Sequence, residues 1–143
     1  MDETDHSLLS ALQDNARASV TELAARLKLA RTTVQSRLDR LERRGVIAGY
    51  TVRLGEVESQ ARIHATVLLQ LDARAVPGVI GRLRAMPQVE RAVTSSGRFD
   101  LVLQLLARST SRLDELLDQI GALPGVRSSE SLIHLSTKID RGA

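Results

Sequence analysis

Apolar residues in the first 44 positions recur at the spacing of amphipathic helices. Over residues 4–15, leucines at i, i+1 and i+4 form one apolar stripe, which predicts a helix. Ser19 stands three residues before Glu22 in the form of a capping box, and this predicts a second, short helix that ends near Leu27. The stripe of the first helix is Leu8, Leu9 and Leu12, and its candidate N-caps are Thr4 and Asp5.

A longer third helix is predicted over residues 31–44, with Gly45 after it as a C-cap. Two short helices separated by three residues, with the longer one second, match a helix-turn-helix. Residues 46–54 then have the composition of a strand. The side chains expected to hold the helices together are Leu23, Ala24, Leu27, Leu29, Val34, Leu38 and Leu41.

The second half of the chain contains one unit twice. A shift of 37 positions aligns two sets of apolar residues at helical spacing, together with the Pro87 and Pro124 segments. Each predicted helix lies between two β-rich runs. The order βαββαβ therefore predicts a ferredoxin-like sandwich, which has four antiparallel strands and two helices on one face. The helical positions are Val76, Val79, Ile80 and Leu83 with Leu113, Leu116, Leu117 and Ile120, and the strand runs are 63–71, 90–95, 100–107 and 130–137.

The sheet face away from these helices is predicted to be partly apolar. Along the first and third strands the outward phase includes Leu68, Val102 and Leu106, although two helices can cover only one face. Another subunit is the simplest cover for such a face, so we expect a homodimer formed through the sheet.

Composition narrows the classes of function. The chain has 143 residues, of which 43% are hydrophobic and 26% charged, and this is typical of folded domains. Without cysteine it has no disulfides and no thiolate metal sites. Its apolar stretches fall far short of the ~20 residues that cross a bilayer, so we expect a cytoplasmic protein with no membrane partner. One Tyr and one Phe argue against base stacking on single strands.

Basic charge is concentrated on the predicted helix-turn-helix. Residues 26–44 carry seven basic side chains against two acidic ones, whereas residues 1–25 carry five acids against one arginine. A focused basic surface favours a polyanion partner, although solvated basic helices are also common. Arg37 flanks the core and is expected to pair with an acid such as Asp14 or Glu22. The candidate base readers are Arg31, Thr32, Gln35 and Ser36, and the candidate phosphate contacts are Arg40, Arg43 and Arg44.

The predicted turn before the third strand could bind a small zwitterion. Gly97 permits a positive φ and exposes backbone N–H groups, Ser95 and Ser96 precede it, and Asp100 supplies an acceptor. Taken alone, a Ser-Gly turn of this kind is more often a plain hairpin.

Motifs in both halves of the chain carry a family resemblance. In the first half they are Thr4-Asp5, Leu8-Leu9, Leu12 to Arg17, Glu22-Leu23-Ala24, Arg37-Leu38, Leu41-Glu42 and Gly45 to Tyr50. In the second half, Gly97-Arg98-Phe99-Asp100 resembles a Gly-x-x-Asp loop of an amino-acid-sensing domain. Together they resemble the Lrp/AsnC (feast/famine) family of transcriptional regulators over nearly the whole chain.

The resemblance implies three segments: a helix-turn-helix DNA-binding domain over residues 1–50, a strand and hinge linker over 51–61, and a ferredoxin-like effector-binding and oligomerisation domain over 62–143. It also implies double-stranded DNA as a partner, dimers that assemble further, often to octamers, and an effector, typically an amino acid, bound between dimers. No cofactor is implied. The implied DNA contacts are Arg31, Thr32, Gln35 and Ser36, and the implied effector contacts are Ser96, Gly97, Arg98 and Asp100.

Two positions depart from the family pattern. Lys28 stands where members usually have Gly, and Ala30 stands where they have a Ser N-cap. Because a non-Gly residue in a left-handed turn costs on the order of 1 kcal/mol, an altered turn is expected, with Thr32 or Thr33 capping the third helix.

The alternative to a regulator is a ferredoxin-like ligand-binding protein or enzyme without a DNA function. His6 lies in the first predicted helix, and His64 and His134 are expected on strands that pair at the sheet edge. No carboxylate stands at ligand spacing beside these histidines, and P-loop, GxGxxG and Ser-His-Asp patterns are missing from the sequence. These observations favour the DNA-binding regulator and no catalytic or metal site.

Overall fold

A computed structural model describes residues 1–141 of the chain, which divides into two compact units, Met1–Val52 and Arg53–Ala143. Residues 142 and 143, the end of the predicted third segment, lie outside the described residues. Among the described residues, no helix is long and apolar enough to span a bilayer. Each unit has a hydrophobic core of its own.

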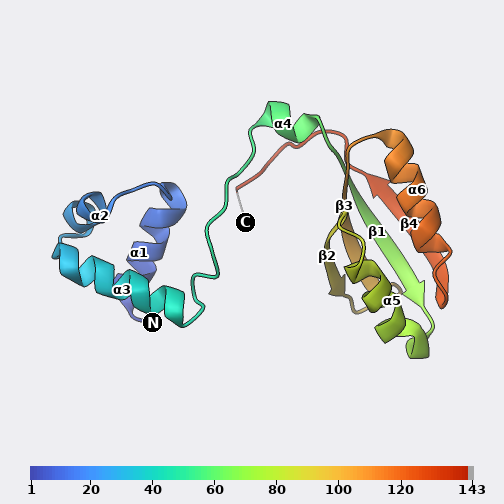
Figure 1. The fold of residues 1–143 in the computed structure, drawn as a ribbon, viewed down its shortest axis with the longest axis horizontal. Coiled ribbons are helices and arrows are strands. Elements are labelled where there is room, and N and C mark those ends of the chain that lie inside the picture. Colours follow the sequence, from blue (N-terminus) through green and yellow to red (C-terminus); the bar gives the residue numbers. More distant parts are fainter. Residues whose placement is uncertain (142–143) are drawn as a thin grey trace. The chain divides into compact units, whose positions relative to one another are not determined.

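The first unit consists of the three predicted helices (Figure 1). They are α1 (Glu3–Asp14), α2 (Val20–Leu27) and α3 (Arg31–Arg43). Each turns one apolar stripe inward, as the i, i+3, i+4 spacing requires, and the stripes meet in a shared core. The buried residues of this core are Leu8, Ala11, Leu23, Ala24, Val34, Leu38 and Leu41.

The observed helix caps agree only in part with those predicted from the sequence. Ser19 caps α2 as predicted, with Oγ accepting from the backbone N–H of Glu22 at 3.1 Å. The predicted N-caps of α1, Thr4 and Asp5, are wrong, because Asp2 is the cap. Asp5 is instead the third helical residue and completes a capping box with Asp2, which satisfies two backbone donors at once.

The segment after α3 differs from its prediction. Arg44 is the C-cap, and Gly45 follows it with φ of +74°. The strand predicted over residues 46–54 is absent from the described chain. The short helix α4 (Glu56–Gln60) follows, near the start of the second unit. Residues that favour strands do so because they fit a half-buried pleated surface. Among the described residues, no strand lies beside residues 46–54 to form such a surface.

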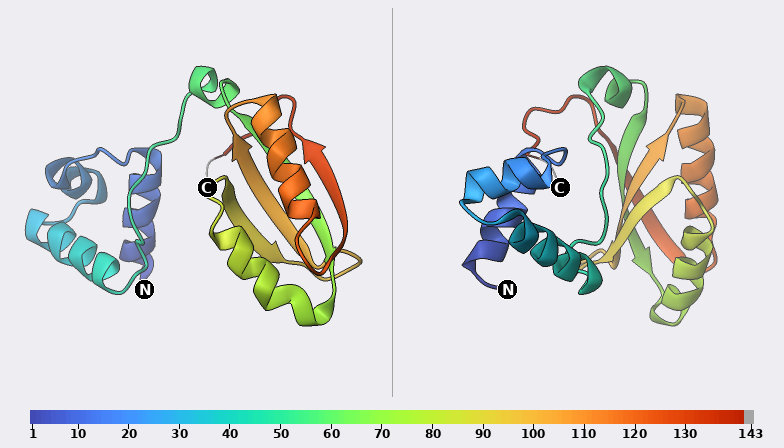
Figure 2. Two further views of the ribbon diagram at one scale, coloured as in Figure 1. Left: turned by 45° about the vertical axis from the view of Figure 1, so that its right-hand side comes forward. Right: turned by 60° about the vertical axis from the view of Figure 1, so that its left-hand side comes forward.

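The second unit is a four-stranded antiparallel sheet with α5 and α6 on one face (Figures 1 and 2). Its spatial order is β2-β3-β1-β4, so β1 is central and pairs with both β3 and β4. This arrangement confirms the predicted βαββαβ order. In chain order the elements are β1 (Ile63–Leu71), a 3-10 turn (Ala73–Ala75), α5 (Val76–Arg84), β2 (Val89–Thr94), β3 (Leu101–Ala107), α6 (Thr110–Gly121) and β4 (Val126–Ile133).

Alternation along β1 and β3 separates the two faces of the sheet. On the helix side every second residue is buried, from Ala65 to Leu71 and from Leu101 to Ala107. On the other side Leu68 and Val102 lie opposite each other and are only partly buried. That second face is therefore the partly apolar one that the sequence predicts.

The strand predicted over residues 130–137 begins and ends four residues earlier. β4 starts at Val126, directly after Gly125, where the chain turns back and pairs with Leu71. It ends at Ile133, and the side chain of Leu135 is 95% exposed. The prediction followed the apolar run around Leu132, whereas the turn at Gly125 sets where pairing begins.

Gly125 provides a test of this turn. Its φ is +92°, and an added Cβ would stand 2.0 Å from the Cβ of Ala75. We expect Gly125→Ala to lower the free energy of unfolding by about 3 kcal/mol, because it combines a left-handed backbone with a steric clash. Gly81→Ala is the control, since Gly81 lies in α5 with no described atom within 4 Å of the added Cβ, and we expect it to raise stability by about 1 kcal/mol. Equal effects in urea titrations would contradict this account.

Candidate DNA interface and effector pocket

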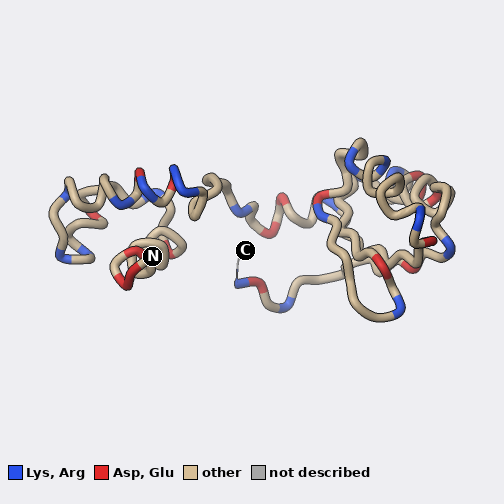
Figure 3. The backbone as a smooth tube through the Cα atoms, turned by 90° about the horizontal axis from the view of Figure 1, so that it is seen from below, with Lys and Arg blue, Asp and Glu red and all other residues tan. Residues whose placement is uncertain are grey.

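The outer face of α3 presents the predicted base readers to solvent. Arg31, Thr32, Gln35 and Ser36 are all exposed. Thr32 and Ser36 lie on the side of the helix opposite the buried Val34, whereas Arg31 and Gln35 lie on the flank between the two sides. Gln35 Nε2 donates to Asp39 Oδ1 at 2.9 Å, one helical turn on. Figure 3 marks the basic and acidic positions along the backbone.

The predicted phosphate contacts fall into two groups. Arg43 Nε donates to the backbone oxygen of Asp39 at 3.3 Å, and Arg43 and Arg44 are both exposed. Arg40 has an acidic partner, since its Nη2 lies 3.4 Å from Asp5 Oδ2. Within residues 1–141, Arg31 and Arg44 form no ion pair, so their charges are available to a polyanion.

The turn between α2 and α3 has left-handed geometry despite its lysine. Lys28 has φ 58° and ψ 45°, so the expectation of an altered turn is wrong. The expected cap from Thr32 or Thr33 is also wrong, because Ala30 is the N-cap and no side chain of the described residues caps α3. The first backbone N–H groups of α3 consequently lack a side-chain acceptor, and such groups favour a nearby phosphate.

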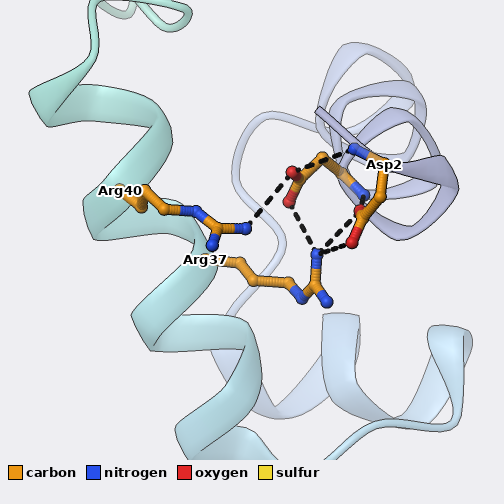
Figure 4. Close-up of polar contacts among 4 residues, drawn as sticks. Asp2, Arg37 and Arg40 are labelled. Carbon is orange, nitrogen blue, oxygen red and sulfur yellow. Dashed lines mark hydrogen bonds and ion pairs between the residues drawn. The ribbon is translucent and has the colours of Figure 1, made fainter.

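A cluster of two acids and two arginines, here called the α1–α3 clamp, joins the two helices (Figure 4). Arg37 Nη1 lies 2.7 Å from Asp2 Oδ1 and 3.0 Å from Asp5 Oδ1, and Arg40 completes the cluster. Asp5 is only 2% exposed. Arg37 therefore pairs with acids as predicted, although its predicted partners Asp14 and Glu22 are wrong.

The clamp shifts the ionisation of its carboxyl groups. The hydrogen bond from Arg37 lowers the pKa of Asp2 to about 2, and the backbone N–H of Asp5 adds to the effect. For Asp5, burial acts to raise the pKa, but the hydrogen bonds from Arg37 and the Asp2 backbone outweigh it and the pKa falls below its ordinary value. Both carboxylates also raise the pKa of Arg37. At neutral pH the clamp is fully ionised.

The clamp predicts acid sensitivity of the first unit. A carboxyl group whose pKa is lower in the folded state contributes stability above its unfolded pKa, here 3.8, and that stability is lost as pH falls through the folded value of about 2. We expect Arg37→Met to lower the melting temperature at pH 7 and to flatten its decline between pH 4 and 2. Circular dichroism melts at several pH values measure both.

Arg26→Gln is the matched control for this effect. It removes the exposed Arg26–Asp14 ion pair, whose side chains are 54% and 70% exposed, and it should leave the pH profile of wild type unchanged. A parallel profile for Arg37→Met and wild type would contradict the assignment.

The turn between β2 and β3 is fixed to β1 by Asp100. Asp100 Oδ2 accepts from the backbone N–H of Leu71 at 2.8 Å, and Asp100 N donates to the oxygen of Leu69 at 2.8 Å. Gly97, in the turn, has φ of +118°, as a residue without Cβ allows. Asp100, one of the predicted effector contacts, thus has hydrogen-bond partners in strand β1.

An open pocket of about 320 Å³ lies beside this turn. Arg98 is the predicted effector residue that lines it, whereas Ser96, Gly97 and Asp100 do not. The lining residues that sequence reasoning missed come from β1 and β4, and pairing between these strands is the signal that places them together. The pocket is lined by Gln70, Arg98, Phe99, Ser128, Ser129 and Glu130. A second hollow, of about 680 Å³, lies between the 3-10 turn, α5 and the turn at Gly125.

The two histidines of the sheet form a stacked pair. The rings of His64 and His134 lie 6.2 Å apart, and Thr66 Oγ1 is 2.8 Å from His134 Nε2. The two histidines lie where β1 pairs with the edge strand β4, as predicted: His64 is in β1, and His134 follows β4 directly and donates its backbone N–H to the oxygen of His64. Among residues 1–141 no group of three His, Cys, Asp or Glu side chains could hold a metal ion.

These two units define a class of protein. A three-helix unit with an exposed, partly basic second helix of a helix-turn-helix has the geometry that binds duplex DNA, and the βαββαβ unit has an open pocket of about 320 Å³ beside the turn between β2 and β3. The combination is that of a ligand-responsive DNA-binding protein.

Comparison with known proteins identifies the family. Residues 1–42 match the AsnC-type helix-turn-helix domain, and residues 64–143 match the Lrp/AsnC ligand binding domain. The chain belongs to the Lrp/AsnC family of transcriptional regulators, which are DNA-binding proteins with a ligand-binding domain and are not enzymes. This confirms the resemblance seen in the sequence, and it sets aside the alternative without a DNA function.

Individual relatives match over nearly their full length. The HTH-type transcriptional regulator Rv2324 of Mycobacterium tuberculosis is 32% identical over 145 residues, covering 99% of this chain and 96% of that protein. The leucine response regulatory protein LrpA of M. tuberculosis is 31% identical with a TM-score of 0.82, covering 100% and 98%. The regulator NMB0573 of Neisseria meningitidis, solved as a complex with L-methionine, has a TM-score of 0.85 at 24% identity, covering 95% and 90%, and shows the shared fold.

Proposed function

We propose that the chain is a cytoplasmic, sequence-specific regulator whose operator binding and assembly respond to an amino acid effector. The observation that carries the proposal is the exposed face of α3. The α1–α3 clamp holds α3 against α1 through residues outside that face. Because Arg37 and Arg40 anchor one side of α3 to α1, the opposite side is left to enter a major groove.

The proposed base contacts are Arg31, Thr32, Gln35 and Ser36. Arginine pairs with guanine and glutamine with adenine through two hydrogen bonds, whereas hydroxyl groups bond to several bases. Arg43 and Arg44, at the end of α3, are placed to contact phosphates, together with Arg40 to the extent that Asp5 leaves its charge available.

Substitutions on α3 test this proposal. In gel shifts against the promoter region of the chain's own gene, we expect Arg31→Ala and Gln35→Ala each to weaken specific binding about tenfold or more. Arg44→Ala should weaken binding to all sequences alike and reduce the salt dependence by about one unit of slope. Arg112→Ala, on α6 and paired with Glu115, is the control and should bind as wild type does. Wild-type affinity of the α3 variants would refute the interface.

The proposed effector is an amino acid bound at the turn between β2 and β3, with Ser96, Gly97, Arg98 and Asp100 as the predicted site. Support comes from two relatives, one of which is a complex with L-methionine and the other a leucine response regulatory protein. Binding at a seam between dimers would change the spacing of paired recognition helices, which must meet major grooves about 34 Å apart. A difference of a few kcal/mol between assemblies is enough for such a response.

The proposed assembly is a homodimer through the open sheet face, with further association of dimers, up to octamers. That face carries partly buried Leu68, Val102 and Leu106, and Val93 and Leu132 are exposed beside them. An apolar surface of this kind on a two-layer unit is stabilised by burial against a second copy.

Charge placed on the open face tests the dimer. We expect light scattering of the full chain at micromolar concentration to give at least a dimer, and Val102→Asp to shift it toward monomer because a buried unpaired carboxylate is costly. Arg84→Gln, at the end of α5 on the helix side, lowers the net charge by the same one unit and should leave the mass unchanged. A monomeric wild type would contradict this part of the proposal.

A further inference from the structure

We propose that the hollow between the 3-10 turn, α5 and the turn at Gly125 binds an amphipathic anion, a small molecule with an apolar body and a carboxylate head group. This helix-side hollow has a volume of about 680 Å³. It shares no lining residue with the pocket beside the turn between β2 and β3. The inference therefore does not rest on the proposed amino acid site.

The interior of the helix-side hollow is mostly apolar. Val79 of α5 and Leu123, which follows α6, line it and belong to the core of the second unit. Ala75 and Pro124 add further apolar surface. Ligand pockets are lined in this way when they hold the apolar body of a small molecule, while a few polar groups fix its orientation.

Backbone contacts fix the shape of the helix-side hollow. Asp72 N donates to the oxygen of Gly125 at 2.9 Å, and Ala75 N donates to the oxygen of Asp72 at 2.9 Å. Gly125 lies so close to Ala75 that no Cβ would fit between them. The segment that joins β1 to α5 is thereby held against the turn before β4. A ligand that enters a preformed hollow of this kind pays little for ordering the protein.

Two arginines give the lining a positive charge. Arg74 lies in the 3-10 turn and Arg82 in the last turn of α5, and both side chains line the helix-side hollow and are exposed. Within residues 1–141 neither forms an ion pair. The acid of the lining, Asp72, already has a partner, since its Oδ1 lies 3.5 Å from Arg127 Nε. The two guanidinium groups are therefore available to an anion.

Apolar surface and unpaired arginines together select the ligand by its charge. A carboxylate accepts charge-assisted hydrogen bonds from a guanidinium, and its hydrocarbon chain is removed from water at the same time. A neutral alcohol of the same length gains only the apolar contacts, and an ammonium meets like charges. The expected ligand is thus an aliphatic monocarboxylate, for which octanoate is a suitable probe.

The test compares three compounds that share an eight-carbon chain. Octanoate, octan-1-ol and octylammonium are titrated by calorimetry into the intact wild-type protein, each below the concentration at which it aggregates. We expect octanoate to bind at least tenfold more tightly than octan-1-ol, and octylammonium to bind more weakly than either.

Arginine variants test the contact with the head group. We expect Arg74→Gln and Arg82→Gln each to weaken octanoate about tenfold and to leave octan-1-ol within about twofold of wild type. Arg84→Gln is the matched control, because Arg84 lies in the same last turn of α5 as Arg82 and is exposed but does not line the hollow. It should change the affinity of neither compound.

Two glycines of α5 provide a matched pair that tests the location of the site. Gly78 lines the helix-side hollow and Gly81 does not, although an added Cβ meets no described atom within 4 Å at either position. We expect Gly78→Leu to fill the hollow and abolish octanoate binding, whereas Gly81→Leu should bind as wild type does. Both variants should fold, because leucine favours a helix more than glycine does, and melts without ligand check this.

Four results would overturn the inference: no binding of octanoate to wild type, binding of octan-1-ol or octylammonium as tight as that of octanoate, equal octanoate affinity in Gly78→Leu and Gly81→Leu, or equal weakening by Arg84→Gln and Arg82→Gln. The last result would indicate attraction by overall charge. None of them changes the gel shifts that test α3, so failure of this site and failure of the proposed function are distinguishable.

Discussion

The central strand β1 must present two different faces, and the second unit depends on this constraint. Its helix-side residues, from Ala65 to Leu71, are buried against α5 and α6, while its outward residues lie on a face that no helix covers. Because side chains alternate along a strand, a slip of one residue would exchange these faces. Pairing with β3 on one side and β4 on the other fixes the register. It also brings Gln70 of β1, residues 128–130 of β4 and the turn before β3 together at the pocket.

Local patterns were sufficient wherever a single element decides the outcome. The spacing of leucines predicted three helices, and alternation predicted β1 and β3 closely. The internal repeat contained enough information to place β4. Shifting residues 90–95 by 37 positions gives 127–132, which lies inside the observed β4. The prediction relied instead on the apolar run near Leu132 and was four residues too far along the chain. The segment 46–54 shows the opposite limit, because strand formation needs a partner as well as a composition.

The candidate sites depend on contacts that spacing does not reveal. The outer face of α3 could be predicted, since it is the complement of the apolar stripe. The partners of Arg37 could not, because Asp2 and Asp5 precede it by 35 and 32 residues and meet it only once α1 packs near α3. Glu130 was missed for a similar reason, as it approaches Arg98 only through the order of strands in the sheet. Lys28 shows that a turn can keep its geometry at an energetic cost when the packed helices on either side demand it.

The position of Asp2 has a practical consequence for handling the protein. The carboxylate of Asp2 caps α1 and also pairs with Arg37, so an affinity tag or surface linker placed directly before Asp2 would emerge beside the α1–α3 clamp. A strongly basic fusion there would compete with Arg37 for Asp2 and Asp5, and a bulky one would crowd the same contacts. Binding measured on protein that is tagged or immobilised next to Asp2 would then reflect a tilted or loosened α3. Attachment at another surface position avoids this artefact.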